Sequence, residues 1–77
     1  MDYFDAVCMY QEFAVGVQYA EFQDKTKEEF MEEWAVKHGR EKILDCMEAL
    51  LKELDEKKEH YLSIGKIAFS ILKRKGL

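Results

Sequence analysis

Residues 2–23 contain no proline, and their apolar side chains fall into two stripes at helical spacing. At about 100° per residue, a broad stripe collects Tyr3, Ala6, Val7, Tyr10, Phe13, Ala14, Val17 and Ala20. A second, narrow stripe collects Phe4, Cys8, Val15, Tyr19 and Phe22. A helix on the surface of a globular protein normally carries one apolar stripe. The pattern therefore predicts a helix over 2–23 that is covered on two sides.

The chain is short for a helix that needs two covers. Its 77 residues make a single domain, and domains of this size bury only about 60% of the surface of the unfolded chain. Oligomerisation is one way in which small domains gain stability. The narrow stripe is therefore a candidate interface, and we expect a homodimer. The alternative is a bundle in which the chain itself covers both stripes.

Two more helical segments follow. Thr26 and Glu29 fit a capping box, which predicts a helix start, and Gly39 suits the end of that helix. From Arg40 onward, apolar residues at 3–4 spacing include Ile43, Met47, Leu50 and Leu54, and the same phase resumes at Tyr61, Gly65, Ala68 and Leu72. The sequence predicts an all-α bundle of three helices, over about 2–23, 27–38 and 40–75. The third is either continuous or broken near 55–62.

The helix over 27–38 carries two features that bear on a partner. Trp34 is either an anchor of the core or a hot spot of an interface, since tryptophan is enriched in both. The acidic run consists of Glu28, Glu29, Glu32 and Glu33. It is either a solvated helix face or an acidic contact face that occupies a basic nucleic-acid site on a target.

The sequence contains no pattern typical of catalysis or metal binding. Di-iron bundles need Glu-x-x-His pairs, but Ala35 and Lys57 stand three residues before His38 and His60. Zinc sites need clustered cysteine and histidine, and Cys8 and Cys46 lie in separate predicted helices. We expect no enzyme, no cofactor and no metal site. Both cysteines fall on apolar faces, which predicts two buried free thiols.

Charge and hydropathy narrow the class of partner. No apolar run reaches the ~18–20 residues of a membrane span, and the absence of a signal peptide predicts a cytoplasmic protein. The net charge of −4 disfavours a dedicated nucleic-acid binder. The sequence therefore predicts a non-enzymatic protein–protein interaction module, a homodimeric regulator or inhibitor of a larger protein. The alternative is a nucleic-acid-binding transcriptional regulator that uses the basic residues Lys66, Lys73, Arg74 and Lys75.

Overall fold

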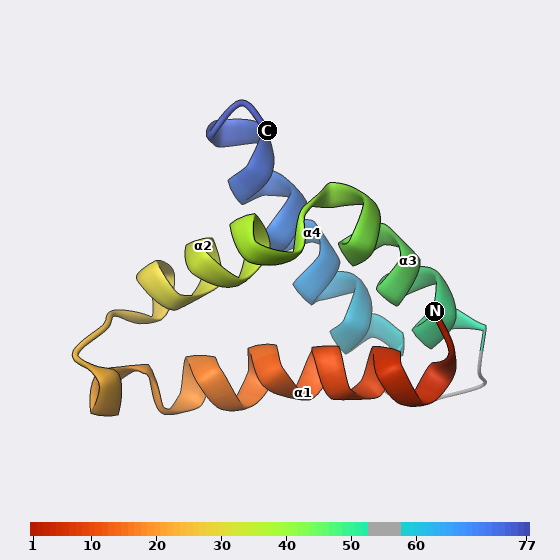
Figure 1. The fold of residues 1–77 in the computed structure, drawn as a ribbon, viewed down its shortest axis with the longest axis horizontal. Coiled ribbons are helices and arrows are strands. Elements are labelled where there is room, and N and C mark those ends of the chain that lie inside the picture. The colour runs from red at the N-terminus through yellow and green to blue at the C-terminus, as the bar shows by residue number, and fades with distance from the viewer. Residues whose placement is uncertain (53–57) are drawn as a thin grey trace.

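The computed structural model describes residues 1–52 and 58–77. Within these ranges the chain forms α1 (Tyr3–Gln18), the 3-10 helix η1 (Ala20–Gln23), α2 (Lys27–His38), α3 (Arg40–Leu51) and α4 (Lys58–Arg74), and no strand. Figure 1 shows α1 lying along one side of the molecule, with the other three α-helices stacked over it. The all-α prediction is confirmed. Of the two predicted arrangements, a continuous third helix or a broken one, the described residues show the second, with four α-helices.

The first helix starts where it is predicted to start and ends earlier. The side chain of Asp2 caps α1 by accepting a hydrogen bond of 2.8 Å from the amide of Asp5. The α-helix ends at Gln18, and the remainder of the predicted helix tightens into η1. Asp24 then adopts a left-handed conformation with φ of 56°, which aspartate tolerates better than most residues. This reversal of the chain allows α2 to pack back on α1.

The ends of α2 confirm the local signals in the sequence. The amide of Glu29 donates to the Thr26 hydroxyl over 3.0 Å, and the amide of Thr26 donates to the Glu29 carboxylate over 3.3 Å. Gly39 ends α2 with φ of 81°, in the left-handed region that favours glycine. Because α3 begins at the next residue, this glycine makes a sharp corner between two helices.

The predicted third helix is divided into α3 and α4, so the four-helix alternative holds and the continuous helix is wrong. The break was predicted near 55–62, but residues 58–62 already belong to α4. Residues 53–57, which include Leu54 of the predicted stripe, lie outside the described residues. Gly65 lets the two helices approach closely, since a Cβ atom there would lie 3.2 Å from the side chain of Met47. The apolar stripes of the two helices thus face each other within one chain and need no second subunit.

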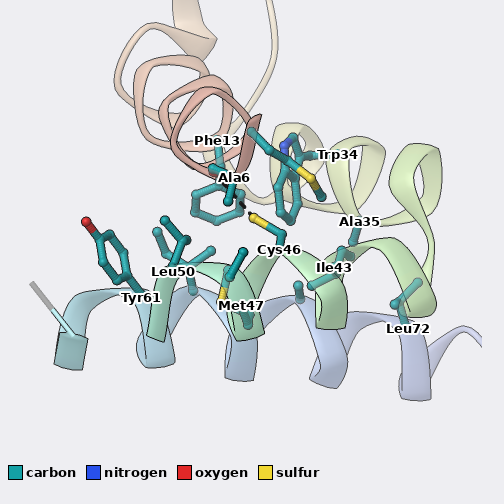
Figure 2. Close-up of a cluster of buried hydrophobic side chains, with 14 of the residues drawn as sticks. Ala6, Phe13, Trp34, Ala35, Ile43, Cys46, Met47, Leu50, Tyr61 and Leu72 are labelled. Atoms are coloured by element: carbon teal, nitrogen blue, oxygen red, sulfur yellow. Dashed lines mark hydrogen bonds between the residues drawn. The ribbon is translucent and has the colours of Figure 1, made fainter. Parts of the chain in front are cut away.

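The core lies where all four α-helices meet, and Figure 2 shows its side chains. Ile43, Leu50 and Leu72 are fully buried there. Trp34 is only 2% exposed, and its ring packs edge-on against Phe13 at a centroid distance of 4.9 Å. Trp34 is therefore an anchor of the core. Its place among the candidate interface residues is corrected, because α1 covers it.

Gly16 determines how closely α1 and α2 approach. A Cβ atom at this position would lie 1.9 Å from Cζ of Phe30, well inside the ~3.5–4.0 Å of a carbon–carbon contact. The half-buried Phe30 ring therefore occupies the space that any other side chain at position 16 would fill. Any side chain at position 16 therefore requires the tip of the Phe30 ring to move.

Candidate interaction surface

The narrow stripe remains exposed in the folded chain. Phe4 is 74% exposed, Val15 53% and Phe22 80%, and Tyr19 and Cys8 are also classed as exposed. The broad stripe, in contrast, supplies buried Ala6 and Phe13 to the core. The structure thus covers one stripe of α1 with its own helices and leaves the other open.

The exposed side chains follow the spacing of a helix–helix contact. The residues at alternating steps of four and three are Phe4, Cys8, Gln11, Val15, Gln18 and Phe22. This is the spacing at which side chains interdigitate between two packed helices. Phe22 lies in η1, where its ring centroid is 5.9 Å from that of Tyr19, so the stripe continues beyond the end of the α-helix.

A hollow of about 500 Å³ opens beside the stripe. It lies where α1 meets α3 and the end of α2, and its lining is Met1, Asp5, Cys8, Met9, Glu12, His38, Lys42 and Asp45. Cys8 belongs both to the stripe and to this lining, so the two features are continuous. At this edge of the apolar surface the carboxylates of Asp5, Glu12 and Asp45 lie together with Lys42 and the N-terminal amine, and the amine pairs with Asp45 over 3.1 Å.

Glu12 fastens this edge to α2. Its Oε1 lies 2.8 Å from Nε2 of His38 and 3.6 Å from Nζ of Lys37. The hydrogen bond with His38, helped by the nearby charges, lowers the pKa of Glu12 below its ordinary value of 4.5. The His38 side chain is 9% exposed and also packs on the ring of Trp34. Sequence reasoning missed this pair, because its residues lie 26 positions apart.

The acidic run of α2 finds partners within the chain. Glu29 completes the capping box, and Glu33 pairs with Lys25 at 2.6 Å. Glu32 pairs with Arg74 at 3.2 Å and with Lys75 at 3.5 Å. The fourth member, Glu28, lines a groove that also contains Lys66 and Arg74. The structure therefore brings the predicted acidic contact face and much of the basic C-terminal segment together.

The two cysteines differ in environment, although both were predicted to be buried. Cys8 is exposed and Cys46 is buried, because the chain covers only the broad stripe of α1. The Cys46 thiol lies 3.4 Å from the carbonyl oxygen of Ala6, a bond drawn in Figure 2. Burial, together with the charge of Asp45, raises the pKa of Cys46 to about 11. Cys46 is therefore an unreactive component of the core.

Other kinds of site find no support in residues 1–52 and 58–77. These ranges contain no group of three or more histidine, cysteine, aspartate or glutamate residues that could hold a metal ion. None of their helices has the length and apolar character that crossing a lipid bilayer requires. Comparisons with protein families, with curated proteins and with solved structures find no significant match. Function is therefore inferred from the exposed side chains of the protein.

Proposed function

We propose that the chain is a non-enzymatic protein–protein interaction module, a small regulator or inhibitor that binds a larger protein through the narrow stripe. The observation that carries the proposal is the exposure of Phe4 and Phe22, at 74% and 80%. Large aromatic side chains dominate the energetics of protein interfaces. Here they lie along one line of α1 and η1, whereas single exposed apolar residues elsewhere are normal for a soluble domain.

The core of the protein is closed without the narrow stripe. The chain closes its own core with α1, α2, α3 and α4, and residues such as Ala6, Ile43 and Leu50 are fully buried there. The stripe could therefore remain open without cost to the packing of the core. Contiguous exposed apolar surface of this kind typically marks a binding site.

The homodimer predicted from the sequence depends on the narrow stripe, which either a second copy or a different protein can cover. A continuous third helix would also have needed a second copy to cover it, and the division into α3 and α4 removes that need. Self-association therefore stays a prediction, and the same experiment that tests the proposal also tests it.

Site-specific photocrosslinking tests the proposal in the cells that make the protein. Phe4 is replaced by p-benzoylphenylalanine, and in a control variant Val36 of α2 is replaced instead. Val36 is 47% exposed but lies off the stripe. We expect the probe at position 4 to form one discrete adduct with a larger protein and the probe at position 36 to form none. An adduct of twice the chain mass would indicate a homodimer. No adduct at position 4, or equal adducts at both positions, would contradict the proposal.

A further inference from the structure

We draw no further inference here: the strongest candidate, the narrow stripe of α1 and η1 with the hollow beside it, is bordered by carboxylates that cations of the same chain already meet, such as the N-terminal amine on Asp45 at 3.1 Å and His38 on Glu12 at 2.8 Å, so nothing in the structure shows what covers it.

Discussion

Replacing Gly16 by alanine is expected to leave the stability of the protein almost unchanged, although the same change stabilises most helices. Alanine in place of glycine in a helix interior gains about 1 kcal/mol. Here the new Cβ would lie 1.9 Å from the Phe30 ring, so the ring must retreat by roughly 2 Å to reach ordinary contact distance. Full burial of a phenylalanine is worth about 1.5–3 kcal/mol. Phe30 is only half-buried, so loss of most of its contact costs roughly 1 kcal/mol and offsets the helix gain. We expect Gly16→Ala to change the free energy of unfolding by less than about 0.5 kcal/mol, instead of raising it by the usual ~1 kcal/mol.

A double-mutant cycle isolates this contact. In a Phe30→Ala background the ring is absent, so Gly16→Ala should raise the free energy of unfolding by about 1 kcal/mol. The effect of Gly16→Ala therefore differs between the two backgrounds, with a coupling of roughly 1 kcal/mol, within the range for residues in contact. Urea denaturation followed by circular dichroism measures each variant, and the fluorescence of buried Trp34 provides a second probe. If Gly16→Ala stabilises both backgrounds equally, the close packing of α1 on α2 is refuted.

Two further predictions concern pH. The pKa of Cys46 is raised to about 11 from 9.0. As the pH rises, the thiol of the unfolded chain therefore ionises before the thiol of the folded chain. The stability that the neutral thiol contributes is complete below pH 9 and is lost between pH 9 and 11. The Cys46→Ala variant has no thiol at this position and should not lose stability in this way. Denaturation of both proteins between pH 9 and 11 compares their free energies of unfolding. If the two free energies changed in parallel with pH, the prediction would be contradicted. The pKa of Glu12 is lowered below 4.5, mainly by the hydrogen bond with His38, so its contribution is present above pH 4.5 and disappears as the pH falls through the lowered pKa. Glu12→Gln should therefore reduce the free energy of unfolding above pH 4.5, and only slightly, because an exposed pair is screened by solvent. In acid the variant and the natural protein should have the same stability. A constant difference in the free energy of unfolding down to pH 2 would contradict this.

The helix ends could be predicted because their signals are local. Asp2 and the Thr26–Glu29 box act within one turn of the chain, and Gly39 acts through its own backbone conformation. No information from the rest of the fold is required to place these boundaries. The early end of α1 escaped prediction, since the residues of η1 have no helix breaker before Asp24.

The division between α3 and α4 could not be decided from the sequence. The apolar positions on either side of the polar residues 55–60 share one helical phase, so a continuous helix and two packed helices bury the same residues. The choice depends on closure of the core by the whole chain, which includes the contact between Gly65 and Met47. Such a contact between separate segments leaves no mark in local periodicity.

The two stripes of α1 were visible in the sequence, but not which of them the chain covers. The narrow stripe was identified as a candidate interface, and it is the exposed one. Cys8 was predicted to be buried because it lies on an apolar stripe, and it is exposed for the same reason as Phe4. Met9, which is 6% exposed, was absent from the predicted broad stripe although its position suits the core.

Counting the reactive thiols of the native protein tests whether the narrow stripe is open while the core is closed, because Cys8 lies in the stripe and Cys46 in the core. The chain has two cysteines, and a chromogenic disulfide reagent added to the native protein reports how many are accessible. We expect one thiol to react at once, identified as Cys8 by mass spectrometry, and the other to react only in denaturant. If neither thiol reacts, the stripe is already covered, and if both react, the core is not closed. Either result would contradict a folded chain that buries its own core and leaves the narrow stripe free for a partner.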